Sequence, residues 1–215
     1  VSHELKTPLQ GIIGSAELIE NGMVKPEDMP RFIGHIRTEA QRLVALIADI
    51  IRLSQLDEGV EMPKENVELL SLAGEVAEDL RAAADKASVT ITTDGQSSIV
   101  FGVRRLLYEM LYNLCDNAIK YNRPGGSIRI HVENREQEAA ISVLDTGIGI
   151  APEHQSRIFE RFYRVDKSHS KASGGTGLGL SIVKHAVQYH HGDIRLTSKP
   201  GEGTVIRITF PAAAQ

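Results

Sequence analysis

The start of the chain repeats apolar residues at alternating steps of four and three, once within residues 5–19 and again within residues 33–54. This spacing is typical of helices that pack at shallow angles in a bundle or coiled coil. Between the two stretches, residues 21–30 contain an Asn-Gly pair and two prolines, which end helices. Residues 1–57 are therefore predicted to form two antiparallel helices. The repeated positions are Leu5, Leu9, Ile12, Ala16 and Ile19, then Ile33, Ile36, Ala40, Leu43, Ile47, Ile50 and Ser54.

Two helices alone bury too little apolar surface to be stable. A symmetric dimer that forms a four-helix bundle would supply the missing surface, and a hairpin packed on a second domain is the alternative. Because Leu5 belongs to the repeat, it is expected to face inward, with His3 and Thr7 one turn apart on the outer side. Pro8 removes a helical hydrogen bond and is expected to bend the helix. The segment Leu56–Pro63 interrupts the helical pattern and is predicted to be a hinge between domains.

The rest of the chain alternates predicted strands with predicted helices. Helices are expected at 69–83, 103–121, from 152, and at 177–191, and strands at 89–93, 98–102, 127–133, 140–145, 193–198 and 204–210. Several strands are joined by short turns, which favours a mixed sheet covered by helices on one face over a doubly wound parallel sheet. The predicted fold class is α + α/β: an antiparallel helical hairpin in residues 1–62, followed by an α/β sandwich in residues 63–215.

Charge and cysteine content narrow the classes of function. The 215 residues carry a net charge of −4 and the basic residues are scattered, so nucleic acid is not an expected partner. The single cysteine, Cys115, excludes an internal disulfide, and no Cys/His group has the spacing of a zinc site. No apolar run has the length of a membrane span, and no signal peptide is visible.

Polar side chains recur along one face of the helix predicted at 103–121. Asn113, Asn117 and Lys120 are spaced by four and three, so they form one stripe. Two amides and an ammonium group on one line can hold a cation and phosphate oxygens. A solvated helix face is the alternative interpretation.

Two glycine-rich turns are candidates for nucleotide contacts. DTGIG begins at Asp145, where a carboxylate at a strand end can accept a hydrogen bond from an exocyclic amine and glycines let the backbone approach a planar ligand. GGTGLGL, from Gly174, opens a helix whose free N–H groups and positive dipole end form an anion site. Between them, IFERFYR and the polar stretch after it have the composition of an anchored lid. An ordinary turn and a mobile surface loop are the alternatives for the first turn and for the lid.

Together these motifs resemble those of the bacterial sensor histidine kinases of two-component systems. HELKTPL resembles the phospho-acceptor box and NLCDNAIKY the asparagine box, while DTGIGI, IFERFYR and GTGLGL resemble the first glycine, phenylalanine and second glycine boxes in the family's order. GEGTVIRITFP resembles the closing strand, and the phosphate-sensing and cell-wall-sensing type is the most similar. The resemblance implies a dimerisation and histidine phosphotransfer domain in residues 1–62. It implies a catalytic ATP-binding domain of the gyrase/Hsp90/histidine-kinase type in residues 63–215.

The resemblance also implies roles for individual residues. His3 would be phosphorylated, Glu4 would be its general base, and Thr7 would position water when the kinase dephosphorylates its partner. Asn113 would bind ATP and hold Mg²⁺. The other ATP-binding residues would be Asn117, Lys120, Tyr121, Asp145, Gly147, Gly149, Arg161, Phe162, Gly175, Thr176, Gly177, Leu178, Gly179 and Leu180. Of these, Tyr121 would pack on the base, Asp145 would bind the adenine amine and Arg161 would approach the γ-phosphate.

The expected activity is ATP-dependent autophosphorylation of His3 in a homodimer and phosphoryl transfer to an aspartate of a response regulator receiver domain, with regulator phosphatase activity. We expect the chain to be the cytoplasmic portion of a bacterial protein that is membrane-anchored through a region outside this sequence. Only Val1 and Ser2 precede His3, so fraying is expected to disorder it and weaken the dimer.

Two alternatives belong to other classes of function. The first is a gyrase/Hsp90-type ATPase with Glu109 as base and His3 inert. Many relatives carry glutamine at the position of Glu109, and a salt-bridging helix residue is its simpler interpretation. The second alternative is a nucleotide-gated dimeric scaffold that does not phosphorylate itself.

Overall fold

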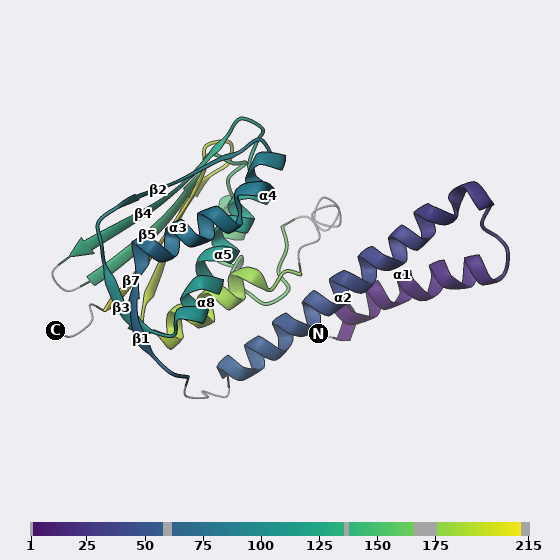
Figure 1. Ribbon diagram of the computed structural model, residues 1–215, viewed down its shortest axis with the longest axis horizontal. Coiled ribbons are helices and arrows are strands. Elements are labelled where there is room, and N and C mark those ends of the chain that lie inside the picture. The colour runs from purple at the N-terminus through teal and green to yellow at the C-terminus, as the bar shows by residue number, and fades with distance from the viewer. Residues whose placement is uncertain (1, 58–61, 136–137, 166–175, 212–215) are drawn as a thin grey trace.

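The computed structural model describes residues 2–57, 62–135, 138–165 and 176–211, and for residues 2, 3, 52 and 55–57 it describes the backbone path only. The predicted helical hairpin is confirmed, with α1 (Ser2–Glu20) packed along α2 (Met29–Asp57) and the 3₁₀ helix η1 (Pro26–Asp28) between them. Figure 1 shows the hairpin extending away from the second domain. The predicted hinge includes residues 58–61, which lie outside the described residues. Among the described residues, no helix combines the length and the apolar character that crossing a membrane requires.

The apolar residues of the hairpin face several directions. Leu9, Ile33 and Ile47, which the repeat assigns to the packed face, are exposed within one chain. Leu46 and Leu53, which the repeat did not include, are each only 3% exposed because they pack against the second domain. A periodic pattern reports that a helix has an apolar face, but α2 has one face for α1 and another for the second domain.

The second domain contains the predicted helices and strands, with two differences. Its elements are β1 (Glu65–Glu68), α3 (Leu69–Asp79), α4 (Arg81–Lys86), β2 (Thr90–Gly95), β3 (Ile99–Gly102), α5 (Arg104–Lys120), β4 (Ser127–Arg135), β5 (Glu138–Asp145), α6 (Pro152–Gln155), α8 (Gly179–Tyr189), β6 (Asp193–Lys199) and β7 (Gly203–Pro211). Strand β1 was not predicted because its sequence, ENVE, has few strand-forming residues, and it forms by antiparallel pairing with β3. The helix predicted at 69–83 is divided at Leu80, where ψ is −2°.

The five-stranded sheet has the order β2-β4-β5-β7-β6, and only the β2–β4 pair is parallel. The mixed sheet predicted from the short turns is therefore confirmed. Helices α3, α5 and α8 cover one face of it, as Figure 1 shows. The core lies between these helices and the sheet, where the fully buried side chains include Leu72, Leu107, Leu111, Ile128, Ile130, Ile141, Val183, Ile208 and Phe210.

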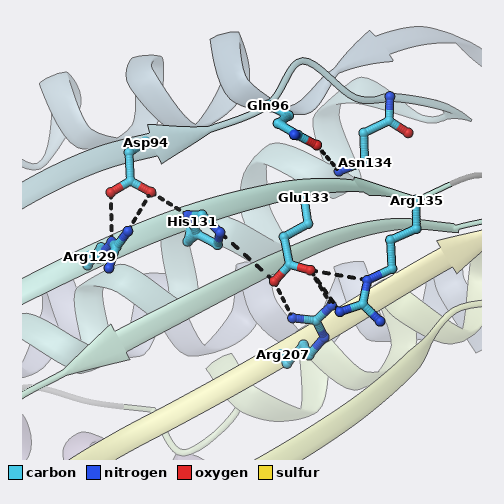
Figure 2. Close-up of polar contacts among 8 residues, drawn as sticks. All are labelled: Asp94, Gln96, Arg129, His131, Glu133, Asn134, Arg135 and Arg207. Atoms are coloured by element: carbon cyan, nitrogen blue, oxygen red, sulfur yellow. Dashed lines mark hydrogen bonds and ion pairs between the residues drawn. The ribbon is translucent and has the colours of Figure 1, made fainter.

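The opposite face of the sheet carries charged side chains that pair across strands (Figure 2). Asp94 accepts a hydrogen bond from Arg129 at 2.6 Å and contacts His131. Glu133 accepts from Arg207 at 2.7 Å and from Arg135 at 3.0 Å, and the Arg207 guanidinium is the main reason that the pKa of Glu133 falls to about 2. Asp94 on β2 thus pairs with side chains of the neighbouring strand β4, an arrangement that stabilises a sheet, whereas Glu133 on β4 reaches across β5 to Arg207 on β7. This face carries ion pairs, while the other face holds the core.

Candidate active site

Helices α5 and α8 bring the polar stripe and the second glycine-rich turn together. Gly179, the first residue of α8, lies so close to α5 that a Cβ there would be 2.9 Å from Asn113 Oδ1 and 3.8 Å from Asn117 Nδ2. Asn113 Nδ2 donates to the carbonyl of Glu109 at 2.8 Å, so its Oδ1 points toward the start of α8. An amide oxygen and the N-terminus of a helix therefore share one small surface.

Two charged residues of α5 lie along the same stripe, and both have ion-pair partners on the helix. Lys120 Nζ lies 2.6 Å from Asp116 Oδ2, one turn earlier. Glu109 Oε1 accepts from Arg105 Nε at 3.0 Å, which agrees with the salt-bridging interpretation of this glutamate. Exposed pairs of this kind contribute little stability, so Lys120 could exchange its partner for a phosphate at small cost.

Asp145 and the turn that follows β5 lie at the C-terminal end of the same helix, α5, beside Tyr121. Burial raises the pKa of Asp145, and hydrogen bonds from the N–H groups of Gly147 and Thr204 offset this only in part. The bond from Gly147 N–H is 2.8 Å long. A half-buried carboxylate with partly satisfied oxygens is suited to accept a hydrogen bond from a bound amine.

The turn after β5 is held against two neighbouring segments. Ile148 N–H donates to the carbonyl of Tyr121 at 3.0 Å, which fixes the turn to the end of α5. Gly149 has φ +69°, and a Cβ there would lie 2.0 Å from the carbonyl oxygen of Lys199. Only glycine fits such a position. The Tyr121 side chain is exposed beside this turn.

The donor set suits Mg²⁺ bound through a nucleotide. Among the described residues, no group of three or more His, Cys, Asp and Glu side chains could hold a metal ion. Asn113 Oδ1 supplies one hard oxygen ligand beside the positive end of α8. Mg²⁺ commonly takes one or two protein ligands and fills its octahedron with phosphate oxygens and water. The residues therefore fit an ion that arrives with ATP.

The phenylalanine box is tied to α8 and to the second glycine-rich turn. Arg161 Nη2 lies 3.1 Å from His185 Nε2 on α8. Phe162 has φ +64°, a rare conformation for a bulky residue, and its N–H donates to the carbonyl of Gly177 at 2.9 Å. Gly175, which was also predicted to bind ATP, lies outside the described residues.

The second glycine-rich turn also contacts the helical hairpin. Leu178 is 0% exposed and Ile182 is 1% exposed, because they form a cluster with Leu46 and Leu53 of α2. The side chain of Leu178 therefore serves the junction between the domains, and Leu180 is partly buried against the core of the second domain. Thr176 Oγ1 donates a hydrogen bond to Asp49 Oδ2 of α2 at 2.8 Å.

The predicted acceptor segment forms the first turns of α1. His3 lies in the helix, but its side chain is outside the described residues. Thr7 is exposed, as expected from the repeat, and Glu4 is half-buried. Leu5 packs against the same cluster as Phe162, so the helix turn that contains His3 lies at the junction with the glycine-rich turn.

Arg164 is a candidate that the sequence reasoning did not single out. Its Nη2 is buried and has no hydrogen-bond partner among the described residues. Burial and the nearby charge of Arg42 lower the pKa of Arg164, while Tyr121 and Glu4 act in the opposite direction. A buried N–H donor of a cationic group is costly when it lacks a hydrogen-bond partner, so the position of Nη2 favours an anion. The motif IFERFYR contains both Arg161 and Arg164, and its sequence does not indicate which of the two is buried.

Comparison with known protein families agrees with this arrangement. Residues 1–59 match the His Kinase A (phospho-acceptor) domain, and residues 102–214 match the histidine kinase-, DNA gyrase B-, and HSP90-like ATPase family. The chain belongs to the histidine kinases, as the sequence motifs predicted.

Particular relatives extend the match over nearly the whole chain. The sensor-like histidine kinase SenX3 of Mycobacterium tuberculosis is 41% identical over 214 residues, which cover 99% of this chain and 52% of that protein. The sensor protein SrrB of Staphylococcus aureus is 34% identical over 214 residues, covering 98% of this chain and 37% of that protein. The chain thus spans about half the length, or less, of these curated relatives.

Solved structures show the same fold. The Acinetobacter baumannii histidine kinase AdeS has a TM-score of 0.81 at 24% identity, covering 99% of this chain and 98% of that chain. The histidine kinase ThkA, in complex with response regulator protein TrrA, has a TM-score of 0.78 at 25% identity, covering 99% of this chain and 60% of that chain.

Proposed function

We propose that the chain is the catalytic core of a sensor histidine kinase, which transfers the γ-phosphoryl group of ATP to His3 and then to an aspartate of a response regulator receiver domain. The proposal rests on the contact between the start of α1 and the second glycine-rich turn. Leu5, two residues after His3, packs with Phe162 against the cluster that contains Leu178. The acceptor helix and the glycine-rich turn that would hold phosphates are therefore neighbours in one chain.

The chemistry of the acceptor needs a neutral imidazole and a base. A histidine with an ordinary pKa near 6.5 is mostly neutral at pH 7 and has a free lone pair. As one ring nitrogen of His3 bonds to the γ-phosphorus, the bond from phosphorus to the β,γ-bridging oxygen breaks and ADP leaves. The other ring N–H becomes acidic, and the Glu4 carboxylate holds or accepts that proton.

The transferred group needs alignment and positive charge more than covalent assistance. We assign Asn113, Asn117 and Lys120 to the phosphates, together with the N-terminus of α8. Mg²⁺ held by Asn113 Oδ1 would neutralise phosphate charge. Tyr121 packs on the base and Asp145 binds its exocyclic amine. Arg161 approaches the γ-phosphate once it leaves His185, and Arg164 adds a second cation on the side that faces Glu4.

The proposed protein acts as a homodimer. Along the hairpin, exposed apolar side chains are supplied by both helices, and Val44 is 69% exposed. A second copy that buries them would complete a four-helix bundle. The exposed apolar residues are Leu9, Ile13, Leu18, Ile33, Val44, Ile47 and Ile51.

The remaining proposals concern the partner and the whole protein. ThkA is described in complex with a response regulator, and we propose that this chain also binds a receiver domain. Thr7 is exposed one turn after His3 and would position water for dephosphorylation of the regulator. SenX3 is longer than this chain, which covers 52% of it. We also propose that the chain is the cytoplasmic portion of a bacterial protein that is anchored in the membrane through a region outside this sequence.

The labelling experiment uses the whole chain and γ-³²P-ATP. We expect label that is stable in base and lost in acid, as a phosphohistidine requires, and no label on His3→Gln. His35→Gln is the matched control, because His35 lies on α2, half-exposed, with a hydrogen bond to Ser15 that glutamine can keep. Label that persists on His3→Gln, or that disappears equally from both variants, would contradict the assignment of His3.

A further inference from the structure

One hydrogen bond links the phospho-acceptor hairpin to the edge of the nucleotide surface. Thr176 Oγ1 donates to Asp49 Oδ2 at 2.8 Å, and the two residues are 127 positions apart in the sequence. The same hydroxyl oxygen accepts from the N–H of Leu178 at 3.3 Å, directly before α8 begins. The carboxylate of Asp49 is thus connected to the N-terminus of α8 through a single hydroxyl group.

A threonine hydroxyl has one proton to donate. Under the proposed function, Thr176 belongs to the turn that binds the phosphates of ATP, whose ionised oxygens only accept hydrogen bonds. In this structure the proton is donated to Asp49. Thr176 therefore cannot donate to a phosphate until it has left Asp49.

The charge of the Asp49 carboxylate also opposes phosphate binding, as the hydrogen bond does. The N-terminus of a helix attracts anions, and the Asp49 carboxylate already lies one hydroxyl away from the start of α8. A phosphate that enters the same turn would meet a like charge. The Asp49 side chain is half-buried, so water screens this repulsion only in part.

The Asp49–Thr176 hydrogen bond lies beside an apolar contact that joins α8 to α2. Leu178, two residues after Thr176, and Ile182 are almost fully buried against Leu46 and Leu53, so these side chains hold α8 on α2. We propose that the Asp49–Thr176 pair is an interdomain latch that opposes ATP binding and that ATP opens. The proposal rests on the proposed function, which places Thr176 at the phosphates. By linkage, the latch weakens ATP binding by the same factor by which ATP weakens the contact between α2 and α8.

The test measures nucleotide affinity on the whole chain by calorimetric titration with the β,γ-imido analogue of ATP in the presence of Mg²⁺. Asp49→Ala removes the acceptor and its charge, and we expect it to bind the analogue about fivefold more tightly, which is about 1 kcal/mol at 1.4 kcal/mol per tenfold. In a Thr176→Val background the same substitution should have no effect, because the donor is already gone. Asp28→Ala is the matched control, since Asp28 is an acidic residue at the far end of the hairpin, paired with Arg31.

Adenosine is the ligand control, because it has the base and no phosphates. Its affinity should be equal in the original chain and in Asp49→Ala if the latch acts against phosphates. In hydrogen exchange, the analogue should increase exchange in residues 46–53 of the original chain, whereas Asp49→Ala should show that increase without nucleotide.

The outcomes separate the latch from the proposed function. If the wild-type chain binds the analogue and Asp49→Ala binds it no more tightly, the proposed latch is contradicted and the proposed nucleotide site is not. An equal gain in the Thr176→Val background, or an equal gain for adenosine, also overturns the latch, since the effect would not pass through the hydroxyl or the phosphates. Failure of every variant and of the original chain to bind the analogue would overturn the proposed function and the latch together.

Discussion

Replacing Glu68 should destabilise the second domain, because this side chain joins three of its elements. Glu68 ends β1 and caps α3, where its carboxylate accepts from the N–H groups of Leu70 at 3.1 Å and Ser71 at 2.6 Å. It also accepts from Ser98 N–H at 3.2 Å, next to β3. Ser98 is buried, so the Glu68→Ala variant leaves its N–H without a partner.

The size of the effect follows from these contacts. Loss of a helix cap costs about 1 kcal/mol, and a buried N–H left unpaired costs about 1 kcal/mol more. We therefore expect Glu68→Ala to lower the free energy of unfolding by roughly 2 kcal/mol at pH 7. At a urea dependence of about 2 kcal/mol per molar, the unfolding midpoint should fall by about 1 M.

The effect should also depend on pH. Burial alone would raise the pKa of Glu68, but the hydrogen bonds from Ser71, Leu70 and Ser98 outweigh it and lower the pKa from 4.5 to about 2. This difference corresponds to about 3.4 kcal/mol at 1.36 kcal/mol per pKa unit, which partial exposure to water reduces to about 1.5 kcal/mol. Because the folded-state pKa is depressed, this stability is present above pH 4.5 and is lost as the pH falls toward 2.

The assay is urea unfolding followed by tyrosine fluorescence. The chain has five tyrosines and no tryptophan, and all five lie in residues 108–189, so the signal reports the second domain alone. Glu65→Ala is the control, because Glu65 is an exposed glutamate on the same strand. The reasoning would be refuted by equal midpoints for the two variants, or by a difference between the original chain and Glu68→Ala that stays constant from pH 7 to pH 3.

Three further predictions concern the site, the dimer and a buried histidine. Gly179→Ala places a methyl group 2.9 Å from Asn113 Oδ1, so the affinity for Mg²⁺-ATP should fall at least about tenfold, which is about 1.4 kcal/mol. Titration should show no loss of affinity for the control Gly34→Ala, whose methyl group meets nothing within 4 Å. Val44→Glu should shift the proposed homodimer toward monomer in light scattering, because it puts a charge on the apolar surface of the hairpin, where Val44 is 69% exposed in one chain. Burial lowers the pKa of His190, and its Nε2 accepts from a backbone N–H at 2.9 Å at the start of α5. The unfolded chain therefore binds the proton first, and the domain should lose stability as the pH falls below about 6.5, measured as a urea midpoint that falls less in His190→Gln.

Most of the fold could be predicted from the sequence, because alternating steps of four and three and short strands between turns are local signals. Strand β1 could not, since ENVE becomes a strand only by pairing with β3, some 35 residues later. The repeat also did not predict that Leu46 and Leu53 of α2 pack against the second domain. Periodicity identifies apolar positions on a helix but does not say which neighbour covers each of them.

The candidate site shows the same division between local and distant information. The motifs predicted that Asn113 and the glycine-rich turn share a nucleotide surface, and Gly179 does lie against Asn113. The motifs did not predict which arginine of IFERFYR has a buried Nη2 that lacks a hydrogen-bond partner among the described residues. The pKa of that arginine also depends on Arg42 and Glu4 of the other domain, which no local motif reports. The motifs also did not predict that the side chain of Leu178 packs against Leu46 and Leu53 of α2.

These distant contacts share one origin, which is the position of α2 between two partners. One face of α2 packs on α1, and another holds Leu178 and Ile182 through Leu46 and Leu53. The exposed apolar residues of α2 would be covered by the second copy of the proposed homodimer. Any movement of α2 relative to α1 therefore changes the surface that receives α8. A signal that arrives along the hairpin would reach the nucleotide turn through packed side chains, without a separate connecting element.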